Sequence, residues 1–279
     1  MKKFNLFLSC FLLFSFVLIS CGDDDESESA KTESNESTPS NGNNKLITHI
    51  AYIHKTYERN VITNFDYDFK YDSQGRVIQL NYSESGSLVN KITIKYNLHT
   101  CEYEKYDAII HKSYKSTFDY DESGRITSDN VTYDDQGFLK TNKSFFFKIS
   151  KGDIESISEK INDKNVIPTG YRYQLYRDFK CMQEANDANL DLNWFLGAYV
   201  EGMSDTDFPG YASLIGLAGK KTAHIIEEYK QYKGYSYWLS VKKNQIKRDN
   251  FGRITKMTYL SDGYSNIDIS ETIINVSYN

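Results

Sequence analysis

The side chains that most often carry out chemistry in proteins are present in this 279-residue chain, but their spacing does not bring them together. The five histidines lack the paired spacing that places two metal ligands on one face of a helix. His49 and His54 are five positions apart, so on a strand they point to opposite faces. No Gly-x-Ser-x-Gly motif is present to expose a nucleophilic serine. The sequence therefore predicts no catalytic residue, no metal and no cofactor, and we expect a protein that is not an enzyme.

Three groups of residues are similar to ligand sites only in part. Asp119 starts a run with oxygen-bearing side chains at positions 1, 3 and 5 and glycine at position 6, as in calcium loops, but position 12 is asparagine instead of the chelating glutamate. Residues 216–222 are similar to a phosphate-binding loop, but Leu214 stands where its first glycine belongs. Asp66 and Asp68 share one strand face, which is more typical of a solvated surface than of a glycosidase acid pair.

Aromatic residues and two cysteines leave binding and cross-linking open. The chain has 23 tyrosines and 16 phenylalanines, and most of them stand on the apolar faces of expected strands, where packing in the core is their default role. Four aromatic residues in or near an irregular segment are candidates for stacking on a ligand: Trp194, Tyr199, Tyr211 and Trp238. An oxidising envelope would allow a disulfide between Cys101 and Cys181, but spacing alone does not decide whether it forms.

The N-terminus carries the pattern of an export signal. Lys2 and Lys3 precede an almost wholly apolar stretch, residues 4–19, which is shorter than the roughly 20 residues that a helix needs to span a bilayer. The exit sequence Leu-Ile-Ser-Cys-Gly, centred on Ser20, resembles the lipobox of bacterial lipoproteins, in which the cysteine is acylated after cleavage. The sequence predicts a signal peptide at residues 1–20 and a lipid on Cys21. The alternative is an ordinary secretory signal in which this cysteine is incidental.

Composition separates a tether from a folded body. Residues 21–44 are rich in Ser, Asn and acids, have no aromatic residue, and cannot bury enough apolar surface to fold, so we expect a disordered tether. The body, residues 45–279, has 30 basic and 31 acidic residues. Such a nearly neutral body argues against a nucleic-acid partner, because phosphate binding needs a basic field. Since no second linker interrupts the body, we expect a single domain.

The body alternates apolar and polar residues with a period of 2. Residues 65–72 alternate aromatic side chains with Asp and Lys, which indicates an antiparallel strand with one buried and one wet face. About a dozen runs of this kind occur along the body, including residues 92–96, 235–241 and 274–278. Residues 189–221 lack this period, and we expect a short helix or a structured loop that covers part of the core.

The breaks between expected strands repeat one another as apolar-x-Tyr-Asp-x-x-Gly-Arg-apolar. The copies are residues 69–77, 118–126, 131–139 and 246–254, with the third weaker and with arginine in the tyrosine position of the fourth. Each copy predicts a hairpin in which the aspartate starts a type I turn and the glycine adopts the left-handed conformation. The turn glycines are therefore Gly75, Gly124, Gly137 and Gly252.

These units resemble the tyrosine-aspartate repeats of Rhs-type bacterial proteins. In the C-terminal half, the stretches 194–196, 216–221 and 248–256 are similar to a lipoprotein family of Bacteroidota, a domain of unknown function with a porin-like fold. This resemblance implies an all-β protein, an antiparallel meander curled into an open or partial barrel. It implies no catalytic residue.

Three roles remain open from the sequence. The first is a surface module that binds a glycan or a host protein, and the second is a structural envelope protein or a carrier of an apolar ligand in a concave sheet. The third, an enzyme such as a hydrolase, lacks a converging set of reactive groups. The acids at positions 23–26 directly follow the predicted anchor and resemble a surface-export signal of Bacteroidota lipoproteins. We therefore expect attachment to the outer membrane and exposure on the cell surface, with the periplasmic face as the alternative.

Overall fold

The structure is a computed structural model that describes residues 46–128, 131–142, 145–159, 175–196, 217–233, 236–263 and 269–279. Within these ranges the side chains at positions 175, 176, 182, 233, 236–238 and 263 are not described. The predicted signal peptide, the lipid-bearing Cys21 and the tether lie outside the described residues. No helix in the described part of the chain is long and apolar enough to cross a membrane.

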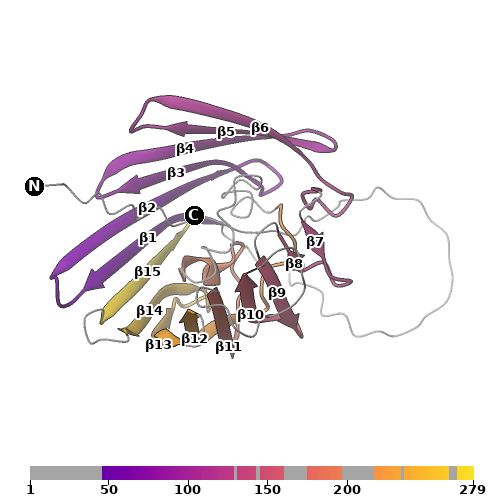
Figure 1. The fold of residues 1–279 in the computed structure, drawn as a ribbon. Coiled ribbons are helices and arrows are strands. Elements are labelled where there is room, and N and C mark those ends of the chain that lie inside the picture. Colours follow the sequence, from indigo (N-terminus) through magenta and orange to yellow (C-terminus); the bar gives the residue numbers. More distant parts are fainter. Residues whose placement is uncertain are drawn as a thin grey trace, which may run out of the picture.

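The described residues form fifteen strands and one 3₁₀ helix (Figure 1). The strands of the first half are β1 Ile47–Thr56, β2 Val61–Tyr71, β3 Val77–Glu84, β4 Ser87–Tyr96, β5 Thr100–Asp107, β6 Lys112–Asp119, β7 Thr132–Tyr133 and β8 Leu139–Thr141. The second half contains β9 Phe145–Ser150, β10 Asp153–Glu159, β11 Leu175–Ala185, the 3₁₀ helix η1 Leu192–Phe195, β12 His224–Lys233, β13 Ser236–Arg248, β14 Ile254–Gly263 and β15 Ser270–Tyr278.

All fifteen strands belong to one antiparallel sheet with the order β6-β5-β4-β3-β2-β1-β15-β14-β13-β12-β11-β10-β9-β8-β7. Every strand pairs with its neighbours in sequence except β6 and β7, and β1 also pairs with the last strand, β15, in the middle of the sheet. The two edges are therefore β6 and β7, which follow each other in the chain but do not pair, so the sheet does not close. This arrangement confirms the predicted all-β antiparallel fold with an open barrel.

The inward face of the sheet forms the core because the apolar residues of the period-2 runs gather there. On β2, Phe65, Tyr67 and Phe69 are buried, while the residues between them are exposed or half-buried. The ring of Tyr67 meets the edges of Trp194 and Phe195 of η1, with centroids 5.7 and 5.3 Å apart. The expected irregular segment thus fills part of the concave side of the sheet, as far as residues 189–196 and 217–221 are described.

The repeated turns have one geometry. In the first copy, the Oδ1 atom of Asp72 accepts hydrogen bonds from the backbone N–H groups of Gln74 and Arg76, both at 2.9 Å. The Oδ2 atom accepts from Nε of Arg76 at 2.8 Å. Gly75 has a φ of +77°, and the other three turn glycines have φ values between +70° and +89°. This is the left-handed conformation that the turn pattern predicts, and it strongly favours glycine.

Each turn arginine also reaches the neighbouring strand. The guanidinium groups of Arg76, Arg125 and Arg253 lie 4.2, 4.8 and 4.5 Å from the ring centroids of Tyr96, Tyr133 and Tyr278, respectively. The hydroxyl of each tyrosine donates to the carbonyl of the residue after that arginine, with distances of 2.9 to 3.0 Å: Val77, Ile126 and Ile254. In these three of the four copies, aspartate, arginine and tyrosine therefore join the turn to a neighbouring strand through charged, cation–π and hydrogen-bond contacts.

The disulfide that the sequence left open is absent. Cys101 on β5 and Cys181 on β11 are both free, and eight strands separate β5 from β11 in the sheet order. Each thiol is desolvated in its own part of the sheet, and this burial raises the pKa of both thiols to about 12. Both cysteines therefore pack as small apolar residues instead of forming a cross-link.

Candidate functional site

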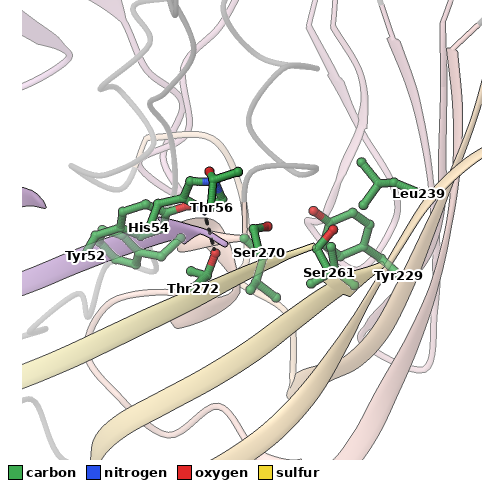
Figure 2. A pocket seen from close by; sticks show the side chains of 11 residues that line it. Tyr52, His54, Thr56, Tyr229, Leu239, Ser261, Ser270 and Thr272 are labelled. Carbon is green, nitrogen blue, oxygen red and sulfur yellow. Dashed lines mark hydrogen bonds between the residues drawn. The ribbon is translucent and has the colours of Figure 1, made fainter. Parts of the chain in front are cut away.

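A pocket with a volume of about 270 Å³ opens on the concave side of the sheet, where β1, β12, β13, β14 and β15 run past the end of η1 (Figure 2). Its lining residues are Tyr52, His54, Thr56, Phe195, Leu196, Tyr229, Leu239, Val241, Ser261, Ser270 and Thr272. Thr56 is the last residue of β1 and Ser270 is the first of β15. The pocket therefore lies at the end of the sheet opposite the Asp-x-x-Gly turn that joins β13 to β14. We call its end the tip end, and we call the other end the turn end.

One wall of the pocket is a row of hydroxyl groups. In the register of the sheet, Thr56 stands opposite Ser270, and Ser270 stands opposite Ser261. Because residues directly opposite each other share a face, their three side chains project to the same side of the sheet. In the part of the chain that the structure describes, none of these three hydroxyls makes a side-chain hydrogen bond to the protein. They are therefore available to a polar group of a ligand.

Thr272 and His54 extend the polar wall. Nδ1 of His54 lies 3.3 Å from the hydroxyl of Thr272, and Tyr52 also forms a hydrogen bond with that hydroxyl (Figure 2). Burial lowers the pKa of His54, so its imidazole is neutral at pH 7. Burial also raises the pKa of Tyr52, and its bond to Thr272 opposes this shift only in part. No other acid or base lines this wall, which makes it polar and uncharged.

The opposite wall is apolar. This wall contains Leu239 and Val241 from β13 and the ring of Tyr229 from β12. Val241 stands opposite Ser261 on one side and opposite Tyr229 on the other, so the line of paired residues that begins with the hydroxyls continues into the apolar wall. Phe195 comes from the end of η1. An apolar wall that faces a few hydroxyls is the usual composition of a site for small molecules.

A buried polar network holds η1 against this wall. Asp191 caps η1, and its carboxylate accepts from the side chain of Asn186 at 2.6 Å and from the backbone and hydroxyl of Thr222, both at 3.2 Å. Asn193 bonds the backbone of β12 at the carbonyl of His224 and at the N–H of Ile226, with distances of 2.6 and 2.7 Å. These bonds fix the rear of the pocket.

The network contains one acid, Asp191, and one base, Lys221, whose charges oppose each other. Lys221 donates to the backbone carbonyls of Asn186 and Ala188. Burial raises the pKa of Asp191 and lowers that of Lys221, and the charge of each group opposes the shift of the other. Because each polar group of Asp191 has protein partners, the network is structural and presents no reactive group to the pocket.

The structure separates several residues that the sequence singled out. His54 lines the pocket, whereas His49 lies on the outer face, where its ring nitrogens are 3.4 and 2.8 Å from Asp66 and Asp68. This confirms that the two histidines point to opposite faces and that the acid pair belongs to the solvated face. The carboxylate of Asp121 accepts from Ser123 and Arg125 within its turn, so the calcium-like run forms a hairpin.

The prediction that Trp194 stacks on a ligand is wrong. Its side chain is 1% exposed, and its ring lies 4.2 Å from that of Phe195, so it belongs to the core. Tyr199 and Tyr211 lie outside the described residues, as does the side chain of Trp238. The phosphate-loop-like stretch docks on the third turn, where the N–H of Lys220 donates to the carbonyl of Gly137 at 2.9 Å.

Sequence reasoning missed the hydroxyl row. Thr56, Ser261 and Ser270 occupy inward positions of strands whose inward faces are mostly apolar. A hydroxyl at an inward position is a usable signal, because a buried polar group needs a partner. The row itself could not be read from the sequence, since it depends on pairing between the first and last strands.

Comparisons with known proteins add little. No family model and no curated protein match the chain. Among solved structures, a porin-like protein from Bacteroides uniformis is 14% identical, covers 84% of this chain and 98% of its own, and has a TM-score of 0.46. A domain from Vibrio parahaemolyticus named for outer membrane lipoprotein sorting is 8% identical, covers 85% of each chain, and has a TM-score of 0.28. Likenesses this distant carry no information on function.

Proposed function

We propose that this protein is a non-enzymatic binding protein of the cell envelope that holds a small, uncharged ligand in the pocket at the tip end. The ligand has an apolar body and at least one hydrogen-bonding group. The observation that carries this proposal is the hydroxyl row of Thr56, Ser261 and Ser270. This row faces an apolar wall in a pocket with a volume of about 270 Å³. No carboxylate, cysteine or cationic side chain lines the pocket, so its residues suit binding better than hydrolysis.

The pocket favours the carrier among the roles that the sequence left open. A module that stacks on glycans needs exposed aromatic rings, and Trp194 is buried. Among the described residues, the large exposed aromatic side chains are Tyr57, Tyr114 and Phe251, and they stand on three different hairpins. They do not form a row on one strand pair. Binding of a host protein remains the second candidate, favoured by the exposed apolar side chains at the tip end.

The place of the protein in the cell is proposed from its sequence. Lys2, Lys3, the apolar stretch at residues 4–19 and Cys21 support a signal peptide and a lipid anchor. The acids at positions 23–26 support export to the outer face of the outer membrane, with the periplasmic face as the alternative. The resemblance to Bacteroidota lipoproteins of unknown function is in accord with this placement.

The fluorescence of N-phenyl-1-naphthylamine, an uncharged aromatic probe that brightens in apolar surroundings, tests the pocket. We expect the full-length protein to bind the probe and Ser261→Phe, which fills the pocket, to weaken binding at least about tenfold, or about 1.4 kcal/mol. Leu260→Phe is the matched control, because Leu260 directly precedes Ser261 in β14 and is exposed.

The same two variants decide the outcome. Unchanged probe binding in Ser261→Phe, with its thermal unfolding also unchanged, would contradict the proposed site. If Ser261→Phe unfolds, Val241→Trp fills the pocket from the other wall and repeats the test. Organic extraction of the protein purified from its own cells, followed by mass spectrometry, then identifies the natural ligand.

A further inference from the structure

Three neighbouring hairpins carry exposed apolar side chains close to their tips at the tip end, beside exposed polar residues such as Glu58, Arg59 and Ser85. The β1–β2 hairpin carries Tyr57, Val61 and Ile62, which are 55%, 49% and 56% exposed. The β5–β6 hairpin carries Ile109 and Ile110, which are 69% and 57% exposed. Isolated exposed apolar residues are common, but several on adjacent hairpins mark an interaction surface.

Backbone hydrogen bonds join these tips to each other. The N–H of Ser85, in the β3–β4 tip, donates to the carbonyl of Asn64 at 2.8 Å. The N–H of Ala108, in the β5–β6 tip, donates to the carbonyl of Val89 at 2.8 Å. The tips therefore form one continuous rim, whose apolar side chains are Tyr57, Val61, Ile62, Leu88, Ile109, Ile110, Tyr114 and Ile269. In Figure 1 the three hairpins end along the left side of the molecule, from indigo to magenta.

The pocket and the rim share residues of the same strands. Thr56 lines the pocket, and the next residue, Tyr57, belongs to the rim. Ser270 lines the pocket, and the preceding residue, Ile269, belongs to the rim and accepts from the N–H of Tyr57 at 3.1 Å. A surface that touches the rim therefore lies beside the mouth of the pocket.

We propose that this apolar rim docks on the surface of a lipid bilayer, so that the pocket exchanges its ligand with the membrane. The inference rests on the proposed function where it concerns exchange, whereas the docking itself rests on the rim. Apolar tips enter the boundary between headgroups and acyl chains because burial of their side chains removes apolar area from water. The amphiphilic lining of the pocket suits a ligand that is stored in a bilayer.

The length of the chain before β1 permits this orientation. β1 begins at the turn end and is about 34 Å long. Residues 21–44, at no more than about 3.4 Å each, reach over at most about 80 Å. A lipid on Cys21 and the rim at the far end of β1 can therefore meet the same bilayer.

The turn end offers a matched contrast. Leu98 and Phe251 are its large exposed apolar residues within the described ranges, at 83% and 81%. They stand on separate hairpins, and Phe251 lies between the charged turn residues Asp249 and Arg253. Such single side chains are ordinary surface features and form no rim.

Quenching of tryptophan by brominated lipids tests the orientation. The lipidated full-length protein is placed on phosphatidylcholine vesicles with dibrominated acyl chains, either as Ile110→Trp or as Leu98→Trp. The parent, which contains Trp194 and Trp238, gives the background emission. We expect the added emission of Ile110→Trp to shift to shorter wavelength and to be strongly quenched, and that of Leu98→Trp to be unaffected.

Each outcome decides the proposal. Equal quenching at both positions would mean that the anchor alone holds the protein without a preferred orientation, which overturns the docking. An unquenched Ile110→Trp would also overturn it and would leave the rim to a protein partner. If Ile110→Trp does not fold, Ile62→Trp on the β1–β2 hairpin repeats the measurement. Because no probe enters the pocket here, failure of the docking is distinguishable from failure of the proposed binding function.

Discussion

The connections at the two ends of the sheet differ in composition and in what they contact. At the turn end, aspartate, arginine and tyrosine satisfy each other and the backbone, and the exposed large apolar residues there are the single side chains of Leu98 and Phe251 among the described residues. At the tip end, the connections carry exposed Val, Ile, Leu and Tyr side chains, and the hydroxyls of the adjoining pocket lack protein partners among the described residues. The repeats therefore stabilise the sheet, and the proposed binding function belongs to the end without them.

The largest effect should come from a glycine at the turn end. A Cβ atom on Gly219 would lie 2.7 Å from the carbonyl oxygen of Gly137, and Gly219 has a φ of +97°. We expect Gly219→Ala to lower the free energy of unfolding by at least about 2 kcal/mol, through strain and displaced backbone. Urea titration of the full-length protein measures this value.

Gly86→Ala at the tip end is the control for that substitution. Gly86 has a φ of +81°, but nothing lies within 4 Å of the position of a Cβ atom. Only the backbone strain of the positive φ remains, and we expect the free energy of unfolding to fall by about 1 kcal/mol. Equal losses of unfolding free energy in the two alanine variants would show that the contact of Gly219 with the third turn contributes nothing to stability.

A β-branched residue in a turn should cost less than the clash at Gly219. Gly124 has a φ of +70°. We expect Gly124→Val to lower the free energy of unfolding by at least about 1 kcal/mol, while binding of N-phenyl-1-naphthylamine at the far end stays the same. Unchanged thermal stability in this variant would remove the turn assignment.

The turn aspartates should make the protein sensitive to acid. Partial burial raises the pKa of Asp72, but the hydrogen bonds and charge of Arg76 outweigh it and hold the pKa below its ordinary value, and Asp121 beside Arg125 behaves alike. A lowered pKa in the folded state gives stability that is present above the unfolded value near 3.8 and is lost as pH falls through the folded value.

Asparagine substitution isolates this contribution. Asp72→Asn should remove part of the pH dependence below about pH 4, with an effect well under about 1 kcal/mol because the carboxylate is partly solvated. Unfolding curves at pH 7 and at about pH 3 measure it. If the parent and Asp72→Asn lose the same stability between these pH values, the ion pair at the first turn is not a source of stability.

The smallest effect on folding should come from the rim. Ile110→Ser removes an apolar side chain that is mostly exposed, so we expect the free energy of unfolding to change by no more than about 0.5 kcal/mol. The same variant should release the rim from vesicles. We expect added protease to cleave its β5–β6 hairpin more readily than that of the parent. A large loss of stability would mean that Ile110 is a core residue.

The sequence was sufficient for the strands and turns because both depend on local patterns. Alternation predicted β2, and the spacing of Asp72 and Gly75 predicted its turn. The contact of Arg76 with Tyr96 was not predictable, because it depends on which strand lies next to the turn. The pocket was hidden for the same reason, since His54 and Thr272 meet across 218 positions of sequence. The disulfide could not be decided, since no local pattern sets the distance between two strands.

Hydrogen exchange of the full-length protein with and without N-phenyl-1-naphthylamine shows which end of the sheet binds a ligand. If the tip end is the binding end, the probe slows exchange in peptides that cover residues 54–57, 259–261 and 270–272. It leaves the turns at residues 72–76 and 249–253 unchanged, because their bonds already persist without a ligand. Protection at the turns, or no protection at the tip end while the probe is bound, would mean that the tip end is not the binding end.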